Sequence, residues 1–535
     1  MSGIIGTKEL RPVTDREMRL APFFGQRIPC CSATILLPRE AAMEKTQFRY
    51  ATSKTLWLVF LLCASICHAQ RAFGQRLQLH PDNSRCFLWR NEPTLLITSG
   101  EHYGALLNLD FDFEAYFDEL EHHGLNLTRT FSGVYLENPA AFNITNNTLA
   151  PASGRYLAPW ARSDQAGYNA GGNKFDLMVW DEAYFERLHS LMQSADRHGV
   201  VVELTLFCPM YRDEMWHDSP MNHINNVNGI GNCERTDVYT LAHSSLLDVQ
   251  LALTRKLVHE LRDYDNLYFE ICNEPYFGGV TKDWQNRIVE EILQEESSLE
   301  VPHLISMNIA NGRERVDQPI HGISIFNFHY CVPPDTIALN SHLKGVIGEN
   351  ETGFRGHDDL LYRTEGWDFM FAGGGLYNNL DYSFSTDHPR GTFREFKSPG
   401  GGSTELRTQL GILKDFLEDV DFWRARPDNS LIDSVTPEHA VSAMHIPGQA
   451  VIAYLHTPLP NKPKDLAALR RRGTEAKLSL RLPPGDYLAQ WISTSDGSVI
   501  GETRITSTQQ NGSSEIVSPK FDDDIALRLL QQSNQ

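Results

Sequence analysis

The sequence predicts an α/β protein with a (β/α)₈ TIM barrel, followed by a small C-terminal β-sandwich domain. Short apolar runs alternate with longer amphipathic segments between about residues 94 and 422, and strands that alternate with helices form a parallel sheet. Eight such runs are present, which is the number of strands that closes a (β/α)₈ barrel. After about residue 435, short runs of period two are separated by Pro, Gly and Asn turns, a pattern typical of a small sandwich.

The expected elements follow one another along the chain. The eight expected strands cover residues 94–100, 125–131, 200–207, 267–273, 303–309, 322–328, 344–350 and 374–382. Between them, apolar residues recur at three- and four-residue steps, which predicts helices. The expected helices cover residues 111–123, 181–198, 241–263, 282–297 and 358–372, with a closing helix near 406–422.

The elements divide the chain into three parts. Residues 1–69 are expected to be a leader, residues 78–425 the barrel, and residues 435–531 the sandwich. A chain of 535 residues exceeds the usual size of one compact core, so a large barrel with an appended domain agrees with the length.

The leader contains the pattern of a secretory signal peptide. After Lys54, an apolar stretch runs from Leu56 to about Cys67, and the small residue Ala69 follows, as in a basic, an apolar and a cleavage region. The stretch is shorter than the roughly 20 residues of a membrane span, so no stable membrane insertion is expected after cleavage near Ala69. A start at Met43 would give a conventional signal. We therefore expect a secreted or periplasmic protein.

The composition and the net charge limit the kinds of molecule that the chain is expected to bind. Hydrophobic residues make up 41% and charged residues 22% of the chain, which are ordinary values for a globular protein. The formal net charge is −20 and no long basic run is present, so nucleic acid is not an expected partner. An uncharged ligand is more compatible than nucleic acid with this negative net charge.

Two of the expected strands end in carboxylates. The stretch "NLYFEICNEPYF", residues 266–277, is apolar up to Cys272 and continues with Asn273 and Glu274, while "GENETGF" places Glu349 and Glu351 after the seventh strand. Catalytic groups of such barrels project from the carboxyl ends of the strands, so these carboxylates are expected at opposite sides of one mouth. A partly desolvated Glu with a raised pKa can protonate a leaving oxygen while an ionised one attacks.

The order of the motifs resembles the family 5, cellulase-like glycoside hydrolases, which belong to a retaining clan with catalytic Glu residues on strands four and seven. The motifs are "GLNLTR" on strand two, "NEP" after strand four, "FNFHYC" on strand six and "ETG" after strand seven. The runs "ITSGEHYGALLNLDFDF" and "AGGGLYNNLDYSF" resemble a little-characterised secreted bacterial branch with a C-terminal sandwich. The resemblance covers most of residues 78–531.

The resemblance implies a role for each residue that matches a motif. Glu274 is the implied acid/base, Asn273 the implied partner of the sugar 2-hydroxyl, and Arg129 the implied support of the nucleophile. Glu351, in an E-x-G motif, is the expected nucleophile, and Glu349 is the alternative. No metal or organic cofactor is expected for this chemistry.

Five further residues are candidates for binding or supporting the substrate. His329 and Tyr330 are adjacent on strand six, whereas the family spaces its His and Tyr by one residue, so the roles of both stay open. His102 and Tyr103 at the end of strand one, and Tyr382 on strand eight, are expected either to line a subsite or to pack.

These features together favour a secreted retaining glycoside hydrolase. It would cleave O-glycosidic bonds of a β-linked oligo- or polysaccharide through a glycosyl-enzyme intermediate, and the same intermediate would allow transglycosylation. The alternative is a catalytically silent carbohydrate-binding or cell-surface barrel, which the departures from the motifs on strands six and seven favour.

Overall fold

The computed structural model describes residues 76–508 and 513–532. The leader, with its signal peptide pattern, Met43 and Ala69, lies outside these residues. Within the described part of the chain, no helix combines the length and the apolar content that a bilayer crossing requires.

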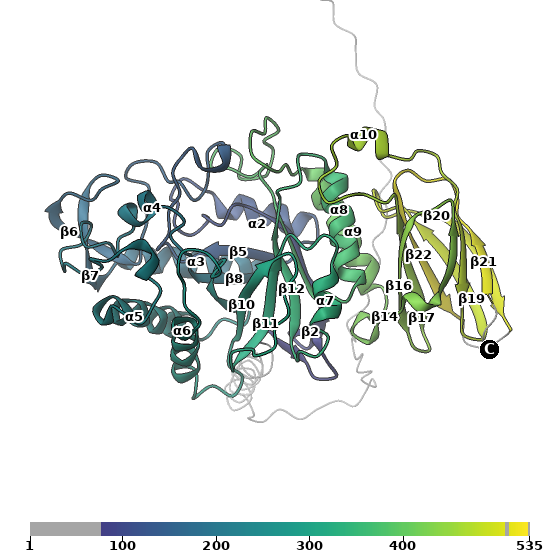
Figure 1. Ribbon diagram of the computed structural model, residues 1–535, viewed down its shortest axis with the longest axis horizontal. Coiled ribbons are helices and arrows are strands. Elements are labelled where there is room, and N and C mark those ends of the chain that lie inside the picture. Colours follow the sequence, from purple (N-terminus) through teal and green to yellow (C-terminus); the bar gives the residue numbers. More distant parts are fainter. Residues whose placement is uncertain (1–75, 509–512, 533–535) are drawn as a thin grey trace, which may run out of the picture. The chain divides into compact units, whose positions relative to one another are not determined.

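Eight strands form one parallel sheet in the order β4-β13-β12-β11-β10-β9-β8-β5 (Figure 1). They are β4 (Leu96–Gly100), β5 (Leu127–Phe131), β8 (Val201–Phe207), β9 (Leu267–Cys272), β10 (Leu304–Asn311), β11 (Ile323–His329), β12 (Val346–Thr352) and β13 (Leu376–Leu380). Asn126 joins the first and last of these strands, because its Oδ1 accepts a hydrogen bond from the Ile97 N–H at 3.1 Å and its Nδ2 donates to the Leu95 carbonyl at 2.8 Å. The predicted (β/α)₈ barrel is therefore confirmed.

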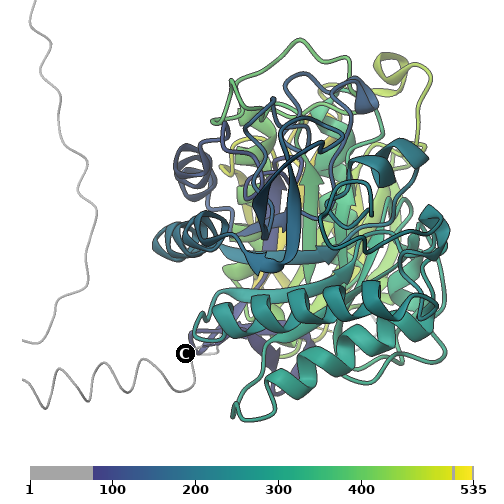
Figure 2. The same ribbon diagram turned by 90° about the vertical axis from the view of Figure 1, so that its left-hand side faces the viewer.

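Helices lie outside the strands (Figure 2). They are α2 (Phe113–His122), α3 (Glu182–Arg197), α5 (Ser244–Leu261), α6 (Lys282–Glu295), α8 (Asp359–Phe371) and α9 (Thr404–Glu418). All six match the helices expected from periodicity, and side chains at most of their amino-terminal ends accept hydrogen bonds from the first turn, as Asp181 does for α3 and Ser403 for α9. The short helices α4 (Asp213–Asp218), α7 (Asp335–Leu339) and α10 (Leu466–Leu469) have too few residues to produce a periodic signal.

A three-stranded antiparallel sheet covers the amino-terminal end of the barrel. It consists of β1 (Gln78–His80), β2 (Asn83–Trp89) and β3 (Glu92–Thr94). Phe87 and Leu77 form one buried cluster with residues at or near the starts of the barrel strands, among them Leu127, Val346 and Leu376. Because this end is filled with apolar side chains, the accessible mouth lies at the carboxyl ends of the strands.

Two antiparallel sheets follow the barrel. The first has the order β14-β16-β17-β22-β19-β20 and the second the order β15-β18-β21. The strands are β14 (Arg426–Pro427), β15 (Ile432–Thr436), β16 (Ala440–Ile446), β17 (Ala450–His456), β18 (Lys477–Arg481), β19 (Gly485–Ile492), β20 (Val499–Ser507), β21 (Ser513–Val517) and β22 (Asp524–Gln531). Trp491 is buried in the core between them.

The sandwich contacts the barrel through β17, whose side chains are buried along its whole length. Tyr454 of β17 stacks on Trp367 of α8 with ring centroids 4.9 Å apart, and Arg363 of α8 donates to Asp524 of β22 at 3.0 Å. A loop after β17 then extends to the barrel mouth, where the Asn461 carbonyl accepts a hydrogen bond from Arg355 at 2.8 Å.

Candidate active site

A cavity of about 840 Å³ lies at the carboxyl ends of the barrel strands. Strand ends contribute Tyr103, Glu274, Tyr330 and Glu351 to its lining. Loop residues complete the wall, and they include Glu137 and Phe142 from the insertion after β5, Tyr211 and Met215 from the insertion after β8, and Asn461 and Lys462 from the sandwich. The cavity therefore combines the barrel mouth with three separate loops.

Glu274 projects into this cavity from the end of β9. Its backbone has a φ of 36°, in the left-handed region that non-glycine residues rarely adopt. Tyr211 donates a hydrogen bond to its Oε2 at 2.7 Å, and His329 Nδ1 lies 3.3 Å from its Oε1. Burial raises the pKa of Glu274, but the hydrogen bonds from His329 and Tyr211, together with the charge of a protonated His329, outweigh it and hold the pKa below its ordinary value. The expected raised pKa is therefore wrong for the free protein.

Glu351 projects into the same cavity from β12 and accepts hydrogen bonds from three side chains. Arg129 donates at 3.0 Å and Tyr103 at 3.0 Å to Oε2, and Tyr330 donates at 2.5 Å to Oε1. A carboxylate with three donors around it is held in one rotamer. The two carboxylates thus have different surroundings.

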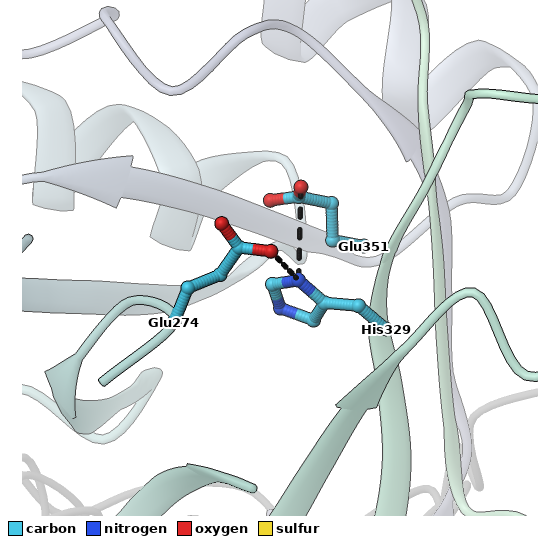
Figure 3. A group of neighbouring side chains, drawn as sticks. All are labelled: Glu274, His329 and Glu351. Carbon is cyan, nitrogen blue, oxygen red and sulfur yellow. Dashed lines mark hydrogen bonds and ion pairs between the residues drawn. The ribbon is translucent and has the colours of Figure 1, made fainter. Parts of the chain in front are cut away.

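Glu274, His329 and Glu351 converge on one point (Figure 3). One ligand atom of each side chain lies within 4.8 Å of the other two, and His329 Nδ1 lies 3.6 Å from Glu351 Oε1. In geometry alone, this Glu-His-Glu group could hold a metal ion. Its two carboxylates face each other across the cavity as the positions of strands four and seven predicted.

A β-bulge separates the two candidate nucleophiles. Irregular register between β12 and both of its neighbours occurs between Glu349 and Thr352, so residues 349 and 351 do not face the same side as strict alternation requires. The Oε1 of Glu349 accepts a hydrogen bond from the Cys331 N–H at 2.5 Å, and its carboxyl group lies beside Glu365 of α8. Glu349 is therefore outside the cavity, and Glu351 is the carboxylate of β12 that lines it.

Substitution of Glu349 by glutamine is expected to stabilise the protein near neutral pH. Burial and the neighbouring Glu365 raise the pKa of Glu349, so its folded pKa exceeds the unfolded value of about 4.3. The wild type is then most stable below that value and loses stability as pH rises toward the folded pKa. Glu349→Gln should remove this loss, about 1.4 kcal/mol for each unit of the shift. Urea unfolding between pH 4 and pH 8 measures the free energy of unfolding of both proteins. The same dependence on pH in the wild type and the variant would contradict this prediction.

His329 and Tyr330 both reach the site although they are adjacent. His329 ends β11, and Tyr330 has a φ of 56°, which turns the chain so that both side chains point to the mouth instead of alternating. Tyr103 also has a left-handed backbone, with a φ of 61°. Backbone conformation thus brings two adjacent side chains to the same site.

Arg129 connects Glu351 to a buried charge network inside the barrel. Its guanidinium donates to Glu270 at 2.6 Å and 3.1 Å, to Asn273 at 2.7 Å and to Glu351. Burial raises the pKa of Glu270, but the charge of Arg129 brings it below its ordinary value, whereas burial and the charge of Glu270 raise the pKa of Glu203. One fully buried cation therefore stabilises two carboxylates, Glu270 and Glu351, whereas the pKa of Glu203 is raised.

His102 forms a second polar contact at the cavity. Its Nε2 lies 3.0 Å from Glu137 Oε2, and Glu137 also accepts hydrogen bonds from Asn147 at 2.7 Å and Tyr135 at 3.3 Å. The Nδ1 of His102 has no hydrogen-bond partner among the described residues. This nitrogen is buried, whereas other atoms of His102 line the cavity. Tyr382, by contrast, is buried behind the cavity and is absent from its lining.

Several site residues carry no local sequence signal. Glu137, Tyr211 and Lys462 lie in long loops whose conformation no periodicity predicts. Asn308 lies within an apolar strand and resembles any polar residue of a barrel interior. Aromatic and acidic residues in the insertions are a signal that points to Glu137 and Tyr211. This signal does not predict which side chains they contact.

No protein-family model and no curated protein matches the chain. Solved structures of similar fold include one described as a glycoside hydrolase, with a TM-score of 0.56 and 14% identity, where the match covers 86% of this chain and 98% of that chain. A glycoside hydrolase family 5 protein from Bacteroides vulgatus has a TM-score of 0.56 and 12% identity and covers 85% of this chain and 94% of that one. At these identities the likeness shows the fold, which is the one that the motifs predicted.

Proposed function

We propose that the chain is a secreted glycoside hydrolase that cleaves O-glycosidic bonds with retention of configuration. One observation carries this proposal: carboxylates from β9 and β12 face each other across a cavity, with oxygens within 4.8 Å. Retaining enzymes place their carboxyl groups about 5–5.5 Å apart, and inverting enzymes leave about 6.5–9.5 Å for a water molecule. The observed proximity supports a double displacement.

The two carboxylates take different steps in this mechanism. Glu351, held by Arg129 and two tyrosines, attacks the anomeric carbon and forms the glycosyl-enzyme. Glu274 donates a proton to the leaving oxygen and then takes one from the incoming water. Since hydrogen bonds keep the pKa of Glu274 low in the free protein, its protonation accompanies substrate binding, when the sugar excludes water from the cavity and competes for the hydroxyl of Tyr211.

The neighbouring residues support substrate binding. Asn273 donates from Nδ2 to Tyr211 at 2.9 Å and accepts from Arg129, which orients its amide at the edge of the cavity for a sugar 2-hydroxyl. His102 and Glu137 supply further polar groups, and Phe142, Phe277 and Phe354 supply aromatic faces of the kind on which sugar rings pack. Secretion is part of the proposal on the strength of the signal peptide pattern before residue 70.

Sugar release tests the proposal directly. The chain from Gln70 to Gln535 is assayed on β-glucans, mannans, xylans and aryl glycosides, beside Glu274→Gln. Loss of the acid should reduce turnover of polysaccharides by about 10²- to 10⁴-fold, and the loss should be smaller for aryl glycosides whose leaving group needs no proton. Proton NMR of the first product should show the anomer of the substrate. The opposite anomer would contradict retention.

A silent carbohydrate-binding barrel is the second candidate. The low pKa of Glu274 favours it, because a carboxylate that stays ionised cannot act as an acid. Glycan binding by the wild type without turnover on any substrate of the panel would support this candidate over the hydrolase.

A further inference from the structure

We propose that Asn308 is a positioning residue that keeps the single proton of His329 on Nδ1. That N–H bond then donates to Glu274 and lies beside Glu351, and the group does not bind a transition-metal ion. The protonation pattern itself does not depend on the proposed function, although its use in catalysis does.

Two independent contacts orient the side-chain amide of Asn308. Its Oδ1 accepts a hydrogen bond from the backbone N–H of Glu274 at 3.1 Å, and a backbone N–H can only donate. Its Nδ2 lies 3.4 Å from the Oδ1 of Asn350. Asn350 is itself oriented, because its Nδ2 donates to Glu203 at 3.0 Å and to Glu270 at 2.7 Å. Rotation of the Asn308 amide by 180° would lose both contacts.

The orientation of Asn308 decides the proton of His329. The Nδ2 of Asn308 faces the Nε2 of His329 at 2.6 Å. Since the amide nitrogen is a donor, the imidazole Nε2 must be the acceptor, and the ring proton lies on Nδ1. Nδ1 is the atom that faces Glu274 at 3.3 Å and Glu351 at 3.6 Å. If Nε2 also carried a proton, the N–H groups of His329 Nε2 and Asn308 Nδ2 would face each other with no acceptor between them.

This arrangement has two consequences for the site. An imidazole with one proton donates a hydrogen bond without a full positive charge, so Glu274 can still be protonated during a reaction. A metal ion requires the lone pair of a deprotonated ring nitrogen, and on Nδ1 the proton occupies that position. Three side chains with the spacing of a metal site therefore form a proton-sharing group.

The substitution Asn308→Asp tests the proposal with little change of shape. The aspartate still accepts the hydrogen bond from Glu274 N–H, but it also accepts one from Nε2–H of His329. Nδ1 then carries no proton, and its lone pair faces the two carboxylates and can bind a metal ion, as in carboxylate-histidine-zinc arrangements. Calorimetric titration of the whole chain with zinc at pH 7.5 should show binding roughly 10- to 100-fold tighter than in the wild type.

A double variant separates the site from the other histidines and carboxylates of the chain. Asn308→Asp combined with His329→Gln should return zinc affinity to the wild-type level. The proposal is overturned if wild type and Asn308→Asp bind zinc equally, or if the tighter binding persists without His329.

The proton position is also measurable in the wild type, without any assay of activity. Nitrogen-15 NMR of labelled protein, with His329→Gln to assign the ring signals, should show a protonated Nδ1 and an unprotonated Nε2. A proton on Nε2 would refute the role of Asn308 even in an active hydrolase. If the proton lies on Nδ1 but the chain shows no turnover, the role of Asn308 stands and only the proposed function is wrong.

Discussion

Substitution of Glu351 by glutamine is expected to abolish turnover of every glycoside that the wild type cleaves. Glutamine keeps the volume of the side chain but cannot attack the anomeric carbon, so no glycosyl-enzyme forms. Removal of a covalent nucleophile costs on the order of 10⁴-fold or more in kcat. Initial rates on the best substrate of the panel give this ratio.

Glu349→Gln is the matched control, because it changes the same residue type two positions away on the same strand. Glu349 lies outside the cavity, so its variant should keep a rate within about twofold of the wild type. Glu351→Gly should regain turnover with added azide, which enters the space left by the side chain and yields a glycosyl azide of inverted configuration. Loss of activity in Glu349→Gln with retention in Glu351→Gln would reverse the assignment of the nucleophile.

Substitution of Arg129 by methionine is expected to destabilise the barrel by about 3–5 kcal/mol. The side chain is fully buried and contacts Glu270 and Glu351. Methionine fills a similar volume but leaves two buried carboxylates without a cation, and their desolvation is then uncompensated. Urea unfolding at pH 7 measures the loss. Activity should fall as well, since Glu351 loses the donor that orients it.

The pH dependence of this variant distinguishes lost charge from lost packing. In the wild type, Arg129 holds the pKa of Glu270 below its ordinary value, so this contribution to stability is present above about pH 4.3 and is lost as pH falls through the folded pKa. In Arg129→Met, burial acts without the charge of Arg129 and raises the pKa of Glu270, so stability should decrease as pH rises above about 4.3. The difference between the two proteins should therefore widen from pH 4 to pH 7.

A surface arginine provides the control for this substitution. Arg390 donates to Asp118 at 2.7 Å, and both side chains are about half exposed, at 52% and 48%. Arg390→Met should change the free energy of unfolding by no more than about 0.5 kcal/mol. A loss for Arg129→Met that is equally small, or independent of pH, would contradict the role of the buried charge.

The periodicity of the chain was sufficient to predict the barrel elements and their order. Strands and helices repeat an apolar period that depends only on neighbours along the chain, so the eight barrel strands and six helices could be read from residues 94–422. The positions of Glu274 and Arg129 followed as well, because a parallel barrel brings the carboxyl ends of all its strands to one mouth.

Which side chains meet at the site depends on the folded barrel. Whether Glu349 or Glu351 enters the cavity depended on a bulge, and whether His329 and Tyr330 both reach it depended on a left-handed residue, neither of which periodicity encodes. The lowered pKa of Glu274 depends on Tyr211 and His329, which come from different strands and loops. Asn308 contacts Glu274, His329 and Asn350, and all three are far from it in sequence. Such effects arise from short-range contacts between distant residues, and these exist only once the barrel has closed.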